Sequence, residues 1–194
     1  LPEAYLFDTG SKEWKMFDQW PAKNTQTKIL SLNLNGGLSE ISTLQYGARS
    51  FESDPLKPVP YTNDVTTTMG FTPFNYMSED QRFAGRRTDV LVYQTDILEE
   101  DMTVGGELLA KLNVSTTGSD ADWVVKIIDV YPANEPNNPY MPNKNVTLSN
   151  YWQMVRSEVM PARFRNSFEK PEAMVPHQET TVNVPLQDVL HTFK

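Results

Sequence analysis

Residues 123–131 read WVVKIIDVY, and this stretch decides the fold class because it is apolar on both faces of an extended strand. Val and Ile favour strands, since their branched side chains pack well on a pleated surface. Successive side chains of a strand point to opposite faces, so an apolar run of this kind must be covered on both sides. One side is expected to face the core of the domain. The other requires a crossing loop, a helix or another domain.

The segments around this stretch also have strand patterns. Residues 108–114 and 182–186 alternate apolar and polar side chains, which is typical of half-buried strands. Residues 90–93, 151–160 and 188–193 are further β candidates. Together they predict a mainly β chain, a jelly-roll-like β-sandwich of the galactose-binding-like type with long loops and one short helix.

The start of the chain predicts a hairpin. Residues 4–7 and 14–17 are rich in apolar side chains and flank the turn-forming sequence DTGSK at 8–12. Residues 30–34 then alternate Leu with Ser and Asn and lead into the turn sequence NGG at 35–37. This pattern predicts a half-buried strand that ends at the turn.

Residues 43–88 form a different region, with four Pro residues and no alternation, and predict a long loop within the domain. A loop of this length in a compact domain is unusual unless it is functional or packs on another structure. A short helix is predicted from Ser78 to Arg87, with Ser78 as its N-cap and Glu79 and Asp80 in its first turn.

The composition excludes several functional classes. The 194 residues include no Cys, so a disulfide framework, a thiolate nucleophile and a Cys-ligated zinc are ruled out. The net charge of −8 argues against nucleic acid and anionic membrane surfaces as partners, because both attract basic proteins. No apolar run approaches the ~20 residues of a membrane span. We therefore expect no nucleic-acid partner and no membrane association.

The sequence lacks the motifs of a self-sufficient catalytic site. It contains no Gly-x-Ser-x-Gly nucleophile elbow. Its two His residues are too few for a His₃ zinc site, and neither has a nucleophile within its own segment. His177 lies in a polar loop and is expected to be solvated, and His191 is expected to be packed or hydrogen-bonded in a strand. No catalytic residue is predicted.

Metal and cofactor motifs are also missing. The carboxylates at 99–101 and 120–122 are interpreted as turns, because the second group lacks the later ligands of a calcium loop. The Gly pairs at 36–37 and 105–106 lack the Gly-Lys-Ser/Thr sequence of a phosphate-binding loop. We expect no metal and no cofactor.

Three long stretches of the chain resemble one known family. These are YMSEDQRFAGRRTDVLVY at 76–93, STTGSDADWVVKIIDVYP at 115–132, and RFRNSFEKP at 163–171, followed by LQD at 186–188 and HTF at 191–193. With PEAY at 2–5, they resemble the C-terminal domain of the X-Pro dipeptidyl-peptidase and cocaine-esterase family. That family includes α-amino-acid ester hydrolases and glutaryl-7-aminocephalosporanic-acid acylases. The resemblance covers nearly the whole chain.

The resemblance implies a role beside a catalytic domain. In that family an α/β-hydrolase domain carries a Ser-His-Asp triad, and the C-terminal jelly roll packs on it and helps to wall the active-site cleft. Nothing here matches the family's nucleophile elbow, triad Asp or triad His, and His191 corresponds to a jelly-roll position. The family pattern continues beyond Lys194. Residues 1–194 are therefore expected to be a C-terminally truncated fragment of a larger serine hydrolase acting on ester or amide bonds, and to be inactive alone.

The resemblance also implies a function for the loop at 43–88. Family members present apolar side chains from this part of the jelly roll to the acyl group of the substrate. The substrate-cleft candidates here are Phe71, Phe74, Tyr76 and Met77. The alternative is that these side chains bury against the missing domain or under the loop itself.

The expected partner is the catalytic α/β-hydrolase domain of the same polypeptide. Two other functions stay open: a stand-alone carbohydrate- or protein-binding module, with Trp14, Trp20 and Trp152 as sugar platforms, and subunit contacts in a homo-oligomer. The ester-hydrolase branch of the family is often exported, which favours a periplasmic or secreted location. The lack of Cys permits any compartment.

Overall fold

The computed structural model describes residues 1–40, 46–63, 77–140 and 146–194, and within them the chain is mainly β, as predicted. The elements, in order, are β1 (Ala4–Asp8), β2 (Glu13–Phe17), β3 (Ser31–Leu32), β4 (Leu38–Ser39), α1 (Arg82–Gly85), β5 (Met102–Val114), β6 (Asp122–Val130), β7 (Trp152–Pro161), the 3₁₀ turn η1 (Ala162–Phe164) and β8 (Thr180–Phe193). None of the described helices has the length and apolar character needed to cross a bilayer.

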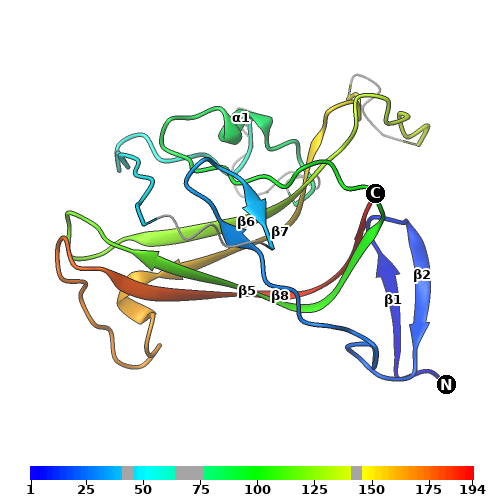
Figure 1. Cartoon of the computed structure of the whole chain (residues 1–194), viewed down its shortest axis with the longest axis horizontal. Helices are drawn as coiled ribbons and strands as arrows, with labels where there is room; N and C mark the ends of the chain where they lie inside the picture. Colours follow the sequence, from blue (N-terminus) through cyan, green and yellow to red (C-terminus); the bar gives the residue numbers. More distant parts are fainter. Residues whose placement is uncertain (41–45, 64–76, 141–145) are drawn as a thin grey trace, which may run out of the picture.

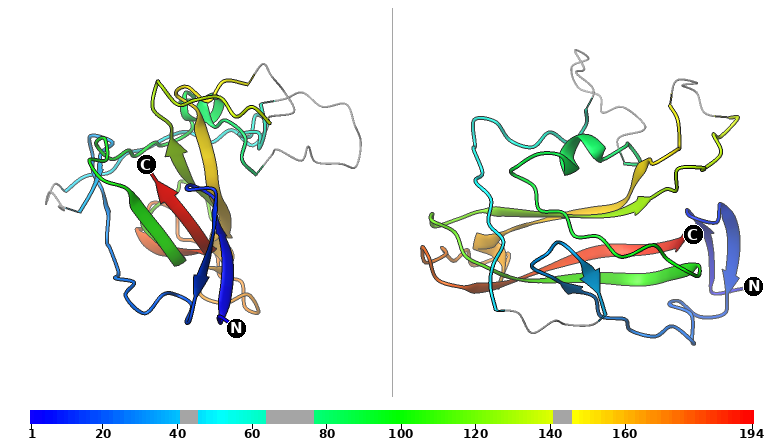
Figure 2. Two further views of the ribbon diagram at one scale, coloured as in Figure 1. Left: turned by 90° about the vertical axis from the view of Figure 1, so that its right-hand side faces the viewer. Right: turned by 45° about the horizontal axis from the view of Figure 1, so that its top comes forward.

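Two long antiparallel ribbons form the sandwich. Strand β5 pairs with β8, and β6 pairs with β7. Figure 1 shows the β5–β8 ribbon lying below the β6–β7 ribbon, and the right panel of Figure 2 shows the same two layers from above. The short helix α1 and its flanking loops lie over the outer face of β6–β7 (Figure 1).

The core lies between the two ribbons. Val182 and Val184 of β8 are fully buried and pack with Met160 of β7. Half-buried residues from β5 and β6 close around them: Ala110, Leu112, Val114, Trp123 and Val125. The alternation at 108–114 and 182–186 therefore does what the sequence predicts, since one face of each strand packs inward.

The apolar stretch at 123–131 forms most of strand β6, as predicted. Its inner face contributes Trp123 and Val125 to the core. On its other face Lys126 is half-buried, whereas Val124 near the start of the strand is 60% exposed. The described residues thus cover the outer face over the middle of the strand and leave its beginning open.

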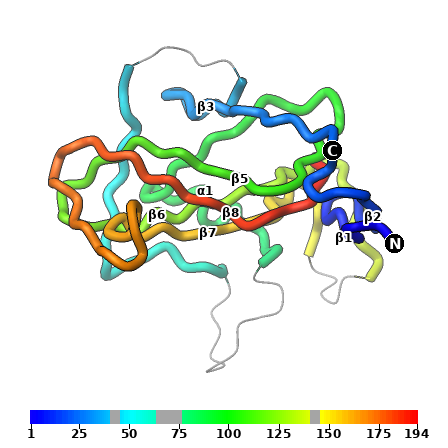
Figure 3. Tube along the Cα trace, turned by 90° about the horizontal axis from the view of Figure 1, so that it is seen from below, coloured from blue at the N-terminus to red at the C-terminus, as the bar shows by residue number. Residues whose placement is uncertain are grey.

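The N-terminal hairpin β1–β2 is confirmed and is fastened to the end of β8. Figures 1 and 3 show the hairpin beside the C-terminal end of the chain. The fastening group is the buried carboxylate of Asp8, which accepts hydrogen bonds from the Thr192 backbone N–H (3.0 Å) and the Thr192 Oγ1 (2.6 Å). It also pairs with Lys15 Nζ at 2.6 Å and accepts from the backbone N–H groups of Gly10 and Ser11. Two segments far apart in sequence are joined through one side chain.

A bulge in β5 explains the Gly pair at 105–106. The register shifts between Gly106 and Leu108, and Gly106 has φ +101°. A Cβ at this position would lie 2.8 Å from Cγ of Pro21, in the segment that follows the hairpin. Gly106 therefore serves a backbone conformation and a close approach that other residues resist.

Three local predictions need correction. The helix predicted from Ser78 is only Arg82–Gly85, with Gln81 rather than Ser78 at the N-cap position, because the Gln81 N–H bonds to the Trp152 carbonyl and Asp80 forms a β-bridge with Gln153 of β7. The strand at 30–34 shrinks to Ser31–Leu32. The run at 90–93 forms no strand, and pairing begins only at Gln94, which bridges Gly37. For the helix, a tertiary contact outweighs the local pattern.

Replacing Asp8 by Asn is expected to lower the free energy of unfolding at pH 7 by roughly 2–4 kcal/mol, because charged, buried hydrogen bonds are lost and the amide turns an N–H toward other donors. Urea unfolding measures the loss. The exposed Asp18, replaced by Asn, is the matched control and should change little.

The same comparison should depend on pH. Burial raises the pKa of the Asp8 carboxyl, but hydrogen bonds from Lys15, Thr192, Ser11 and Gly10 outweigh burial and hold the pKa well below its usual range. A depressed native pKa stabilises the fold fully above the unfolded value of about 4 and progressively less below it. The difference between wild type and Asp8→Asn should shrink as the pH falls from 4 towards 2. An unchanged difference would contradict the assignment.

Candidate functional site

The segment 77–87 forms a polar layer on the outer face of the β6–β7 ribbon. In sequence it begins with Met77, the last of the four cleft candidates. It includes α1 and lies above β6 and β7 (Figure 1). Met77, the first residue of the layer, is 53% exposed. The other three candidates, Phe71, Phe74 and Tyr76, lie outside the described residues.

Gln81 is the hub of this polar layer. Its side chain is fully buried. Its Nε2 donates to the backbone carbonyl of Glu79 at 2.8 Å, and its Oε1 accepts from Lys126 Nζ of β6 at 2.7 Å. Its backbone N–H donates to the Trp152 carbonyl of β7 at 2.9 Å. One residue therefore ties the layer to both strands beneath it.

Asp80 makes a second set of ties. Its Oδ1 accepts from the backbone N–H of Arg82 at 3.0 Å and from that of Trp152 at 3.3 Å, while Oδ2 pairs with the Arg82 guanidinium at 2.5 Å. A β-bridge also joins Asp80 to Gln153. The carboxylate replaces the cap that the sequence assigned to Ser78.

Gly85 ends α1 directly against the ring of Trp152. A Cβ on Gly85 would lie 2.2 Å from Cζ3 of that indole, so no larger residue fits without a shift of the ring or the helix. This close approach fixes the distance between α1 and β7. A Gly within a helical pattern can indicate a close approach, so Gly85 was a detectable signal in the sequence. The sequence did not indicate that the neighbouring side chain is Trp152.

Charge within the layer is balanced by Lys126 and Glu79. Burial lowers the pKa of the Lys126 amine, and the negative charge of Glu79 acts in the opposite direction. Glu79 is 8% exposed, and its Oε2 has no hydrogen-bond partner. A buried carboxylate oxygen of this kind is uncommon and is costly unless a positive charge lies near. Lys126 supplies that charge from the doubly apolar strand.

A small aromatic cluster extends the layer along the ribbon. Tyr131 and Tyr151 pack with Leu148, with ring centroids 6.2 Å apart. The Tyr151 hydroxyl donates to the Ser78 carbonyl at 3.1 Å, and burial raises the pKa of this hydroxyl. The cluster therefore holds the start of the layer from a second direction.

The two His residues lie where the sequence predicted. His177 is exposed in a loop, and its backbone N–H bonds to the Thr116 carbonyl. His191 is fully buried in β8, with Nε2 3.0 Å from Asp129 Oδ2 and Nδ1 2.8 Å from Thr9 Oγ1. The Thr9 backbone N–H also bonds to the Leu190 carbonyl, so this chain of groups fastens the hairpin to β8 and β6.

The carboxylates at 120–122 are engaged in a turn. Asp120 accepts from the backbone N–H groups of Ala121 and Arg163 and pairs with the Arg163 guanidinium at 2.7 Å. Asp122 contacts the same guanidinium. In the described part of the chain no group of three or more His, Asp or Glu is arranged to hold a metal ion.

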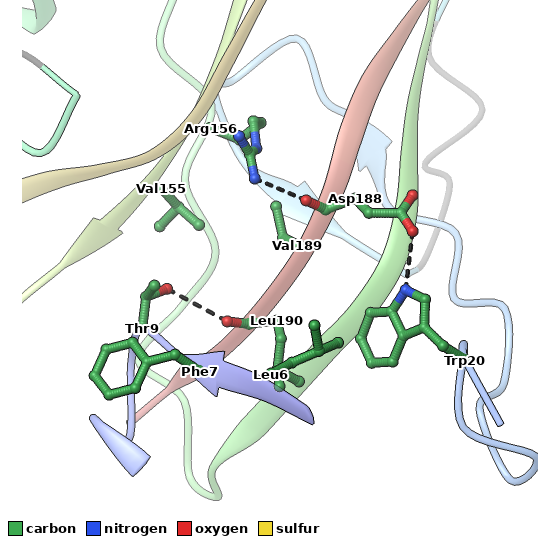
Figure 4. Close-up of a pocket in the computed structure, with 9 residues that line it drawn as sticks. All are labelled: Leu6, Phe7, Thr9, Trp20, Val155, Arg156, Asp188, Val189 and Leu190. Atoms are coloured by element: carbon green, nitrogen blue, oxygen red, sulfur yellow. Dashed lines mark hydrogen bonds between the residues drawn. The ribbon is translucent and has the colours of Figure 1, made fainter. Parts of the chain in front are cut away.

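A separate cavity of about 250 Å³ lies between the hairpin, β7 and β8 (Figure 4). Its walls include the apolar side chains of Leu6 and Val155. At one side the Arg156 guanidinium donates to the Asp188 carbonyl at 2.7 Å, and its buried Nε–H has no partner. Trp20 Nε1–H donates to the Asp188 carboxylate at 2.9 Å. None of the lining residues of this cavity belongs to the polar layer.

The three Trp residues proposed as sugar platforms lie in different surroundings. Trp14 packs against Tyr5 and Phe7 on the hairpin with tilted rings, Trp20 lines the cavity, and Trp152 packs under Gly85. They form no common platform.

Comparison with known proteins identifies a family and a curated relative. The model of the X-Pro dipeptidyl-peptidase C-terminal non-catalytic domain matches residues 1–194. A cocaine esterase from Rhodococcus sp. (strain MB1 Bresler) is 32% identical over 141 residues, which are 68% of this chain and 24% of that protein.

Two solved structures are similar over the whole chain. An aminopeptidase from a marine sediment Thaumarchaeota archaeon is 36% identical with a TM-score of 0.85, and this chain covers 31% of it. An α-amino acid ester hydrolase is 32% identical with a TM-score of 0.87, and this chain covers 32% of it. The chain thus spans 24–32% of the length of these relatives.

Replacing Gly85 by Ala should destabilise the chain by about 1–3 kcal/mol, because the added methyl group overlaps the Trp152 ring. The fluorescence of the displaced indole should change along with the urea midpoint. Gly118→Ala is the matched control, since the nearest atom to its Cβ would be 3.8 Å away. Equal midpoints for the two variants would show that α1 is not held against β7.

Proposed function

Because the chain belongs to the family of X-Pro dipeptidyl-peptidase C-terminal non-catalytic domains, we propose that it is the accessory β-sandwich domain of a larger serine hydrolase that cleaves ester or amide bonds. In this proposal the domain packs on the catalytic α/β-hydrolase domain of the same polypeptide and shapes its substrate cleft. The names of the relatives support the reaction class: an esterase, an aminopeptidase and an amino acid ester hydrolase.

The division of chemistry follows from what this chain carries. The catalytic domain would supply a Ser nucleophile that is acylated by the substrate, a general base, and backbone N–H groups for the oxyanion. The described residues here contribute a surface, the polar layer 77–87, which is held by hydrogen bonds to β6 and β7. His191, the buried His of the chain, is held between Asp129 and Thr9 in a fastening role.

The observation that carries the proposal is the anchoring of the polar layer 77–87 on both β6 and β7. Gln81 and Asp80 fix its backbone, and Gly85 sets its height above the ribbon. A surface that contributes to a substrate cleft must be held rigidly, because small displacements of a positioning group weaken catalysis. Met77 stands at the start of this layer, immediately after Phe71, Phe74 and Tyr76 in sequence.

We include these four residues in the proposal as the apolar wall for the acyl group of the substrate. Their apolar character suits an acyl chain or ring, which gains binding free energy from leaving water. A stand-alone sugar- or protein-binding module is the alternative function, and contacts between subunits of a homo-oligomer are a further role.

The first prediction concerns activity. The 194-residue chain is expected to show no turnover of p-nitrophenyl esters or aminoacyl p-nitroanilides, whereas the longer native polypeptide should hydrolyse at least one of these classes. Turnover by the chain alone would overturn the non-catalytic role. A native polypeptide of only 194 residues would favour the binding-module alternative.

The second prediction concerns the cleft. In the longer polypeptide, Phe71→Ala, Phe74→Ala, Tyr76→Ala and Met77→Ala should raise KM for substrates with a bulky acyl group by roughly 5–30-fold, because each removes apolar contact area worth about 1–2 kcal/mol. Acetyl esters should be affected less. Phe168→Ala, in a loop beyond η1, is the control. Unchanged KM values for all four variants would remove them from the cleft.

A further inference from the structure

The β1–β2 hairpin has one face that packs on the domain and one that does not. The register places Tyr5 opposite Met16 and Phe7 opposite Trp14, so these four side chains share one face. We call them the aromatic face. Asp8, on the other face, points into β8 as described above.

The aromatic face is apolar, continuous and open. Its side chains are between 41% and 67% exposed. The Trp14 ring lies 4.9 Å from the Tyr5 ring and 5.4 Å from the Phe7 ring, so the side chains form one surface. Figure 1 shows the hairpin at the edge of the molecule, beside the end of β8. Contiguous apolar patches of this kind mark interaction sites, whereas single exposed apolar residues do not.

The cavity described above borders the same surface. Phe7 belongs to the aromatic face and also lines the cavity (Figure 4). Val155 of β7 and Leu190 of β8 also line this cavity. The aromatic face therefore borders a partly apolar hollow between the hairpin and the sandwich.

We propose that the aromatic face is the surface through which this domain docks on the catalytic domain of the same polypeptide. This inference rests on the proposed function. The family is a C-terminal domain, and the chain spans only 31% of the related aminopeptidase, so the larger part of such a polypeptide precedes the hairpin. A domain that is tethered close to the hairpin has a high effective concentration at the aromatic face of the hairpin. Interfaces between domains of one chain need only moderate apolar area, which four large side chains can anchor.

Charge specifies the docked surface further. The exposed carboxylates of Glu3 and Asp18 flank the two hairpin strands, two residues from Tyr5 and Met16 of the aromatic face, and the whole chain has a net charge of −8. The facing surface is therefore expected to present an apolar patch bordered by Lys or Arg, because like charges at an interface rim are unfavourable.

Hydroxyl-radical footprinting of the longer polypeptide tests the docking directly. Trp14 and Met16 should be oxidised about tenfold more slowly in the native polypeptide than in the same polypeptide unfolded in guanidinium, since docking excludes water from them. Phe168 is the control, because it is 74% exposed in the loop beyond η1, which lies at the other end of the sandwich from the hairpin in Figure 1. Its protection should be about twofold or less. Free oxidation of Trp14 and Met16 would overturn the proposal.

Dilution separates docking within one polypeptide from docking of a second copy of the chain. Docking within one polypeptide is independent of concentration, so protection should persist over a hundredfold dilution of about 10 µM protein. Protection that disappears on dilution would assign the aromatic face to a second copy of the chain and overturn the proposal.

A double variant tests the energetic role. Trp14→Thr with Met16→Thr removes the apolar area but keeps a residue that favours strands. In the longer polypeptide, cleavage between the domains by a trace of protease should become about tenfold faster, and Phe168→Thr should leave it unchanged. The amide of Thr192 donates to Asp8, so unchanged hydrogen exchange at Thr192 shows that the hairpin itself still folds. Unchanged cleavage with a protected Thr192 amide would overturn the docking surface.

The two proposals fail in different ways. A longer polypeptide without esterase or amidase activity overturns the proposed function. An active hydrolase in which Trp14 is freely oxidised leaves that function intact and overturns the docking surface alone.

Discussion

The fold depends on one constraint: β6 is apolar on both faces and must be covered on both. The inner face meets this requirement through β5 and β8, where Val182 and Val184 are fully buried. On the outer face the polar layer 77–87 covers the middle of the strand, where it places Gln81 and Glu79 over Lys126, while Val124 near the start of the strand stays 60% exposed. The layer that we propose for the cleft is thus the same layer that covers the middle of β6.

Polar groups then decide how the remaining parts attach. Asp8 and His191 are both fully buried, and each has its polar atoms satisfied by segments distant in sequence. Buried polar groups of this kind tolerate little rearrangement, because an unsatisfied partner costs free energy. The hairpin is therefore held at a defined angle to β8, and its aromatic face is presented in a fixed direction.

The sequence predicted the elements whose pattern is local. The alternation at 108–114 and 182–186 and the turn-flanked hairpin at 4–17 are found in the structure, because burial of one face produces those patterns directly. The helix expected from Ser78 was wrong in its start, since the Trp152 carbonyl captures the Gln81 N–H. The roles of Gln81 and Lys126 were missed, since their hydrogen bond joins residues 45 positions apart. Met77 lies at the start of the layer, and its role in a substrate cleft, to which only the resemblance points, stays a prediction.

A domain without catalytic groups can contribute to an enzyme only through its surfaces, and the surfaces here differ in kind. The polar layer is anchored by hydrogen bonds to two strands, which suits a wall that must not move while a substrate binds. The aromatic face is held from behind by the Asp8 network and is apolar in front, which suits adhesion. In the proposed arrangement the aromatic face supplies the binding free energy between domains, and the polar layer stays outside the interface. If the polar layer were the docking surface instead, Glu79 and Lys126 would lose their remaining hydration on docking, which costs free energy.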